Sequence, residues 1–187
     1  MVFLRDGRVI GRGVFQNAAR RLASLARGCI YTAPRMDYYQ PDIKLINSNS
    51  VATFLELYQS LDDDPLKRGK QFERFAKWFL KNDPEWSTQV DQIWLWEEYP
   101  ERWGIDCGVD LVFKHKNGET WAVQAKCYSP GRDITKYDVD KFLSESNRKD
   151  IDKRLLIATT DRIGPNARQV CDAQDKKVVL SHFYNVG

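Results

Sequence analysis

Two short apolar segments in the second half of the chain carry polar residues of the kinds that bind a hard metal ion. Asp110 stands within Gly108–Phe113, and Gln124 and Lys126 stand within Trp121–Cys127. Polar groups in such segments cost free energy unless they are paired or bound to an ion. Because side chains alternate along a strand, Gln124 and Lys126 are expected on one face of the second segment.

The sequence Asn117-Gly118 separates the two segments and is a strong signal for a hairpin turn. The second strand therefore folds back beside the strand that begins near Asp110. This arrangement brings a carboxylate, an amide oxygen and an ammonium group to one edge of a sheet. Mg²⁺ prefers oxygen ligands and keeps several of its waters. We expect Asp110 as the main ligand of Mg²⁺ or Mn²⁺, supplemented by the Gln124 side-chain oxygen or the Ala125 backbone carbonyl.

These groups suit the metal-assisted hydrolysis of a phosphodiester. A bound metal activates water and stabilises charge on phosphate oxygens. Lys126 would either orient or deprotonate the water, or stabilise the charge of the transition state. Glu73, at the edge of the apolar arc of a predicted helix, would support the site behind the metal ligands or bind a second metal. The alternative for Glu73 is an ion pair with Lys77 one turn later.

The elements around these residues predict an α/β fold. Asp62-Asp63-Asp64-Pro65 begins a helix that ends at Asn82-Asp83-Pro84. The elements expected after this helix are strands at Ile93–Glu97, Val109–Lys114 and Thr120–Tyr128, a helix at Thr135–Ser146 with Asp138 at the capping-box position, a strand at Arg154–Thr160, a helix at 165–174 and a strand at Lys177–Phe183. Three consecutive strands followed by alternation favour a mixed β-sheet flanked by helices. Two further helices are expected at 14–27 and 51–61.

The order of a helix with Glu, a strand with Gly-x-Asp and a strand with Gln-x-Lys resembles the PD-(D/E)xK nuclease superfamily. Val109-Asp110 followed by Val123-Gln124-Ala125-Lys126 resembles its Mrr-like branch. Longer similarities to the N-terminal nuclease domain of type ISP restriction-modification enzymes and related helicases are Arg68-Gly69-x-x-Phe72-Glu73, Trp94-Leu95-Trp96, Ala122 to Tyr128, Phe142 to Ser146 and Arg154 to Thr160. The resemblance covers about residues 62–183.

This resemblance implies a restriction-endonuclease-like fold with an αβββαβ core and a Mg²⁺-dependent endonuclease that cuts double-stranded DNA in a restriction or genome-defence system. The helix acid of the family falls on Glu73, its metal-binding Asp on Asp110, and its Gln-x-Lys on Gln124 and Lys126. Asp106 corresponds to an acid often present in Mrr-like sequences, and it is either a further metal ligand or a residue that caps or hydrogen-bonds the Cys107-Gly108 turn. Gln124 departs from the acidic ligand of the wider superfamily.

Basic residues suggest where a polyanion binds. Tyr128, Arg132, Lys136 and Lys141 follow the candidate catalytic strand and either contact DNA phosphates or form a solvated basic face. Residues 1–49 are expected to form a basic arm and linker, and residues 50–187 the nuclease domain. The arm either contacts a polyanion or is a solvated leader, and it also has the composition of a transit peptide.

Composition limits the class of protein. The 187 residues are 42% hydrophobic and 29% charged, which fits a globular chain. No apolar run approaches the ~20 residues of a membrane span, and the cysteine spacing predicts no zinc site, so we expect a reduced, cytoplasmic protein. The expected partners are DNA and either a second copy or a motor and methyltransferase segment. A non-catalytic DNA-binding or assembly module is the alternative function.

Overall fold

The computed structural model describes residues 2–5, 8–12, 58–105, 108–129 and 131–182. The predicted helix at 14–27, the linker that follows it and most of the predicted helix at 51–61 lie outside these residues. Asp106 also lies outside them. The proposed boundary between an arm and a domain near residue 49 therefore stays a prediction.

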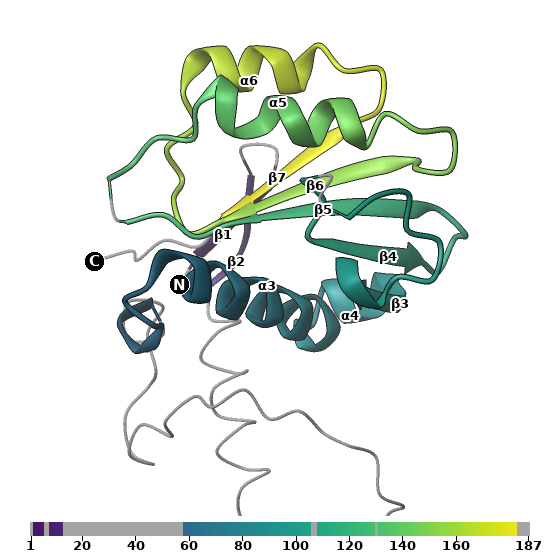
Figure 1. Cartoon of the computed structure of the whole chain (residues 1–187), viewed down its shortest axis with the longest axis horizontal. Helices are drawn as coiled ribbons and strands as arrows, with labels where there is room; N and C mark the ends of the chain where they lie inside the picture. Colours follow the sequence, from purple (N-terminus) through teal and green to yellow (C-terminus); the bar gives the residue numbers. More distant parts are fainter. Residues whose placement is uncertain (1, 6–7, 13–57, 106–107, 130, 183–187) are drawn as a thin grey trace, which may run out of the picture.

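One mixed five-stranded sheet forms the centre of the described fold (Figure 1). Its strands, in spatial order, are β3 (Val90–Leu95), β4 (Leu111–His115), β5 (Thr120–Lys126), β6 (Lys153–Ala158) and β7 (Val178–His182). β3, β4 and β5 form an antiparallel meander, whereas β5, β6 and β7 are parallel. The mixed sheet and all five of its strands confirm the sequence-based prediction.

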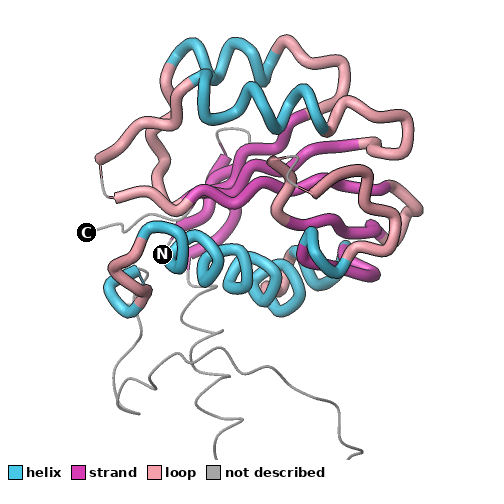
Figure 2. Tube along the Cα trace, viewed as in Figure 1, coloured by secondary structure: helices cyan, strands magenta, loops and turns pink. Residues whose placement is uncertain are grey.

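Helices cover both faces of this sheet, as Figure 2 shows in cyan against the magenta strands. They are α3 (Pro65–Asn82) and α4 (Trp86–Gln89) on one face, and α5 (Lys136–Glu145) and α6 (Pro165–Asp172) on the other. A short 3-10 helix, η1 (Trp96–Glu98), follows β3. Residues of β5 pack into both layers because alternate side chains point to opposite faces: Trp121 and Val123 pack with α3, and Ala122 packs with α5 and α6.

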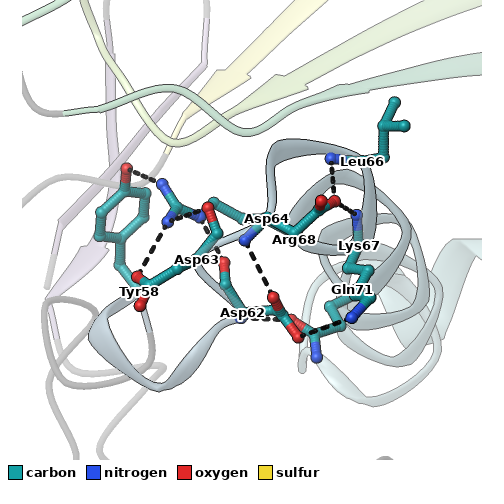
Figure 3. Close-up of polar contacts among 8 residues, drawn as sticks. All are labelled: Tyr58, Asp62, Asp63, Asp64, Leu66, Lys67, Arg68 and Gln71. Carbon is teal, nitrogen blue, oxygen red and sulfur yellow. Dashed lines mark hydrogen bonds and ion pairs between the residues drawn. The ribbon is translucent and has the colours of Figure 1, made fainter.

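α3 begins and ends at the predicted residues. The Asp64 side chain accepts hydrogen bonds from the backbone N–H groups of Leu66 and Lys67, and Pro65 occupies the first turn. The Arg68 guanidinium, in the first turn of the helix, reaches back to the preceding segment. It donates to the backbone oxygens of Asp62 and Asp63 and to the Tyr58 hydroxyl (Figure 3). The buried residues Phe72, Phe75, Ala76, Phe79 and Leu80 form the face that packs on the sheet.

The parallel half of the sheet is tied together at one end by a buried cation, Arg154, at the start of β6. Its side chain is fully buried and has no carboxylate partner among its hydrogen bonds. The guanidinium donates to Ser146 Oγ, Leu143 O, Asn147 Oδ1, Gln174 Oε1 and Lys176 O. Arg154 thereby joins β6 to the C-terminal end of α5 and to the segment between α6 and β7.

A two-stranded antiparallel hairpin near the N-terminus was not predicted from the sequence. Its strands are β1 (Val2–Arg5) and β2 (Arg8–Arg12), with Arg5 opposite Arg8, and β1 contacts β7. The two residues between the strands are Asp and Gly, a pair that favours hairpin turns. The basic arm was predicted from its charge alone, without this turn signal.

Candidate active site

Asp110 lies at the edge where β4 begins and is fixed by the backbone on both sides. Its Oδ2 accepts a hydrogen bond of 2.7 Å from the Ala125 N–H. Its own N–H donates to Val123 O at 2.9 Å, and its carbonyl accepts from the Trp96 N–H at 2.8 Å. The carboxylate therefore bridges from the start of β4 to the end of β5, as the predicted hairpin required.

The surroundings of Asp110 disfavour its charge in the absence of a cation. Burial is the main cause, and the nearby Glu73 carboxylate adds to it, together raising the pKa of Asp110 to about 7. The Ala125 N–H, Lys126 and Lys70 act in the opposite direction. A bound divalent cation would remove this penalty, because it stabilises the ionised carboxylate directly.

Gln124 is buried in β5 and its amide is held in one orientation. Nε2 donates to the Gly108 carbonyl at 3.0 Å. Oε1 is buried and has no hydrogen-bond partner among the described residues. Such an oxygen is rare in a folded protein, and an ordered water, an ion or a ligand can satisfy it. Gly108 has a φ of +63°, and a Cβ there would lie 3.3 Å from Lys141 Cγ, so the turn that presents this carbonyl favours glycine.

Lys126 follows Gln124 on the same face of β5. The side chain is half-buried, and its ammonium makes no hydrogen bond or ion pair with the part of the chain that the structure describes. It lies close enough to Asp110 to lower the pKa of that carboxyl group. Its backbone oxygen accepts from the Thr159 N–H at 3.0 Å, which anchors this end of β5 to the residue after β6.

The Ala125 carbonyl points to the same side as Asp110. The N–H and C=O of one residue in a strand point to the same neighbouring strand, and alternate residues point to opposite strands. Ala125 N–H donates to Asp110, and the carbonyl of Val123, two residues earlier, accepts from the Asp110 N–H. The Ala125 carbonyl is therefore directed to the β4 side of β5, the side from which Asp110 is held, and its role as a metal ligand stays a prediction.

Glu73 approaches Asp110 from the α3 face, opposite the face that carries Gln124 and Lys126. Its side chain is 9% exposed and pairs with Lys70, whose Nζ lies 2.8 Å from Glu73 Oε2. Burial raises the pKa of Glu73, and Lys70 opposes that shift. Lys77, the alternative partner considered from the sequence, pairs instead with Glu98. Sequence reasoning missed Lys70, although its spacing of three residues from Glu73 suits a helical ion pair.

Comparison with known proteins identifies the family. The profile of an Mrr-type catalytic domain, described as a restriction endonuclease, matches residues 81–186. The chain belongs to the restriction endonuclease family. No curated protein matches the chain.

Two solved structures are similar to this restriction endonuclease domain. One is an ATP-dependent type ISP restriction-modification enzyme, LlaBIII, bound to DNA, with 29% identity and a TM-score of 0.59 over 71% of this chain. The other is the MspJI restriction endonuclease in complex with a 27-mer oligonucleotide, with 18% identity and a TM-score of 0.48 over 81% of this chain. The chain spans 8% of the first protein and 33% of the second. The predicted resemblance to a type ISP enzyme is confirmed.

The restriction endonuclease domain offers an oxygen-rich donor set that fits a hard divalent cation. The donors are the Asp110 carboxylate, the unpartnered Gln124 Oε1 and the Ala125 carbonyl. No cluster of three or more His, Cys, Asp or Glu side chains suited to a metal occurs among the described residues. The candidate site does not depend on such a cluster, because an amide and a backbone carbonyl supply two of its three oxygens. Asp106 stays a predicted ligand.

The four residues predicted to contact DNA lie after the candidate catalytic strand and differ in how far other side chains already engage them. The Arg132 guanidinium stacks 4.0 Å from the Tyr128 ring centre and lies 3.6 Å from Asp138. Lys136 pairs with Asp140 at 2.6 Å. The Lys141 stem lies against Gly108, next to the Gln124 amide. Their contact with DNA stays a prediction, and Arg132 and Lys136 would have to share their charge with an acid.

Ionisation of Asp110 should make the stability of the metal-free domain depend on pH. The folded pKa of about 7 exceeds the ordinary value of 3.8, so the folded state binds more protons than the unfolded state between these values. The contribution of Asp110 to the free energy of unfolding therefore falls as pH rises from about 4 to about 7, by at most about 1.4 kcal/mol per pH unit. Above that range the contribution is constant.

Urea unfolding in EDTA at a series of pH values measures this effect. Asp110→Asn should remove the part of the slope that Asp110 causes, so the difference between the two proteins isolates it from Glu73 and Asp83, whose raised pKa values act with the same sign. An identical pH dependence in both proteins would exclude an uncompensated Asp110 carboxylate.

Proposed function

We propose that this domain is a Mg²⁺-dependent endonuclease that hydrolyses phosphodiester bonds of double-stranded DNA in a restriction or genome-defence system. The observation that carries the proposal is Gln124 Oε1, which is buried and has no hydrogen-bond partner among the described residues. It belongs to the strand whose Ala125 N–H holds Asp110, a carboxylate whose charge is disfavoured without a cation. The family supports a nuclease of restriction systems. The type ISP relative is itself bound to DNA.

Asp110, Gln124 and Ala125 would hold the metal, which activates water and stabilises charge on the phosphate when bound. The Ala125 N–H fixes one Asp110 oxygen and leaves the other free to act as a ligand. The Gly108 carbonyl accepts from the Gln124 amide nitrogen, so the amide oxygen would remain available as a metal ligand. These contacts position the donors before substrate binds, which reduces reorganisation during the reaction.

Lys126 supplies the positive charge that phosphodiester hydrolysis needs at the phosphate. A water oxygen forms a bond to phosphorus while one P–O ester bond breaks, and negative charge accumulates on the non-bridging oxygens and the leaving oxygen. The unpaired Lys126 ammonium can donate hydrogen bonds to these oxygens. Glu73 would either carry a proton or contact the site through a water molecule from the α3 side. The ion pair with Lys70 keeps the Glu73 carboxylate in place.

The larger setting of the domain is also proposed. No helix among the described residues is long and apolar enough to span a membrane. The type ISP enzyme is described as ATP-dependent, and this chain corresponds to 8% of it. We propose that the domain acts in the cytoplasm either as a nuclease module of a larger enzyme with motor and methyltransferase segments or as a homodimer.

Cleavage of supercoiled plasmid tests the proposed activity. The wild-type protein should nick or linearise the plasmid with Mg²⁺ or Mn²⁺ and should be inactive in EDTA. Asp110→Asn, which preserves the shape of the side chain, should reduce the rate by about 10³-fold or more, the scale on which loss of a key catalytic group acts. Equal cleavage by Asp110→Asn, or cleavage that persists in EDTA, would reject the proposal. Tight DNA binding without metal binding would favour a non-catalytic module.

A further inference from the structure

A basic groove on α3 lies beside the candidate active site, and none of the residues proposed for catalysis lines it. It is an open groove of about 360 Å³. Its lining residues are Leu66, Lys67, Lys70, Gln71 and Arg74. Three of these carry a positive charge and none carries a negative one. Lys67 and Lys70 each have one carboxylate partner outside the lining, at 3.9 and 2.8 Å, but both side chains stay more than half exposed, so the groove can still accept an anion.

The acidic residues that precede α3 make most of their polar contacts with the start of the helix (Figure 3). Asp64 accepts from the first backbone N–H groups of the helix, and the Asp63 carboxylate lies 3.4 Å from Arg68. Asp62 accepts from the Asp64 N–H at 2.9 Å and lies 3.9 Å from Lys67. These acids are engaged by the chain that starts the helix, and the Lys67 side chain stays 70% exposed.

Gln71 adds a fixed neutral donor between the cations. Its Oε1 accepts from the Asp62 N–H at 2.7 Å (Figure 3). The oxygen is therefore engaged, and the amide nitrogen has two N–H groups to offer a ligand. Amides and cations together are the usual donors to phosphate oxygens of DNA.

The groove adjoins the candidate site through Lys70 and Glu73. Lys70 lines the groove, is 58% exposed and pairs with Glu73, whose charge acts on Asp110. The first turns of α3 also lie near the end of β5, since Cys127, the residue after Lys126, packs against the hydrophobic cluster that contains Phe72 of α3. The beginning of α3 and the end of β5 are thus at the same end of the sheet (Figure 1).

We infer that this groove binds backbone phosphates of the DNA next to the cleaved bond. Lys67 and Arg74 are separated by seven residues of helix, about 10 Å, which is the length of duplex axis over which one DNA strand carries about three phosphates. The basic row continues along α3 with Lys77 and Lys81, in the direction away from the groove. The inference deepens the proposed function in one respect, since it requires that the domain bind DNA, but it does not require that the domain cut it.

Binding of a short DNA duplex at several salt concentrations, in EDTA to prevent cleavage, tests this groove. The double variant K67Q/R74Q should weaken binding to duplexes of unrelated sequence equally. It should reduce the slope of log affinity against log salt by about 2, since each lost phosphate contact removes about 0.9. K116Q is the control, because Lys116 is an exposed cation after β4, at the other end of the sheet. It should keep the wild-type slope.

The outcomes separate the groove from the nuclease activity. An unchanged salt slope in K67Q/R74Q, while the wild-type protein binds and cuts DNA, overturns the groove alone. A reduced slope in a protein that binds but never cuts supports the groove and rejects the proposed function. The single variant K67Q changes only an exposed side chain and should lower the slope by about 0.9. If the double variant loses affinity only because it unfolds, K67Q will keep the wild-type slope. That result would overturn the inference.

Discussion

Replacing Lys126 by methionine is expected to lower the rate of DNA cleavage by about 10³-fold, within the range for loss of a charge-stabilising or proton-transferring group. The structure leaves this ammonium without a partner in the described chain, half-buried and near the Asp110 carboxylate. Methionine keeps the length and apolar stem of the side chain, so packing around β5 should be preserved. The initial rate of plasmid nicking with Mg²⁺, measured well above neutral pH so that Asp110 is ionised, gives the effect.

Metal binding separates a catalytic role of Lys126 from a structural one. Mn²⁺ binding measured by calorimetry should survive in Lys126→Met, because the proposed ligands are Asp110, Gln124 and Ala125. Lys116→Met is the matched control and should cut at the wild-type rate, since Lys116 lies at the opposite end of β5. Full activity in Lys126→Met would remove this residue from the reaction.

Replacing Arg154 by methionine is expected to lower the free energy of unfolding by about 3–5 kcal/mol, through several buried acceptors left without donors. The guanidinium is fully buried and serves acceptors from α5, from the segment after α5 and from the segment before β7. Methionine fills most of the volume but donates no hydrogen bond. Several buried oxygens would therefore lose their partner at once.

Urea denaturation at fixed pH measures this change. Arg168→Met is the control, because Arg168 is exposed on α6 and its replacement should change stability by no more than about 0.5 kcal/mol. Equal stabilities of the two variants would show that water replaces the Arg154 donors without cost. Metal affinity per folded molecule should be unchanged in Arg154→Met, because Arg154 is at the other end of β6 from the candidate site.

Local rules account for the parts of the fold that were predicted correctly. Asp64 and Pro65 specify the start of α3, and Thr135 with Asp138 forms the predicted capping box of α5, where the Thr135 N–H donates to Asp138 Oδ2 at 2.8 Å. The Asn117-Gly118 turn fixes the β4–β5 hairpin, and with it the contact between Asp110 and β5. Each of these features depends on residues close in sequence.

The features that were missed depend on contacts between distant elements. Arg154 was predicted within a buried strand, but its acceptors come from residues up to 22 positions away. The choice of Lys70 over Lys77 as partner of Glu73 follows from Glu98, which engages Lys77 from η1. The opposite placement of Glu73 and Gln124 across the sheet follows from which helix covers which face. A single sequence contains no direct signal for these arrangements.

β5 is the one strand shared by the antiparallel and parallel halves of the sheet, and it is paired with β4 on one side and β6 on the other. A slip of β5 by one residue would turn Gln124 and Lys126 to the α3 face and put Val123 or Ala125 in their place. A chain folded in that register would have lost its metal donor and its cation together. The proposed cleavage of DNA would thus depend on correct registration of β5.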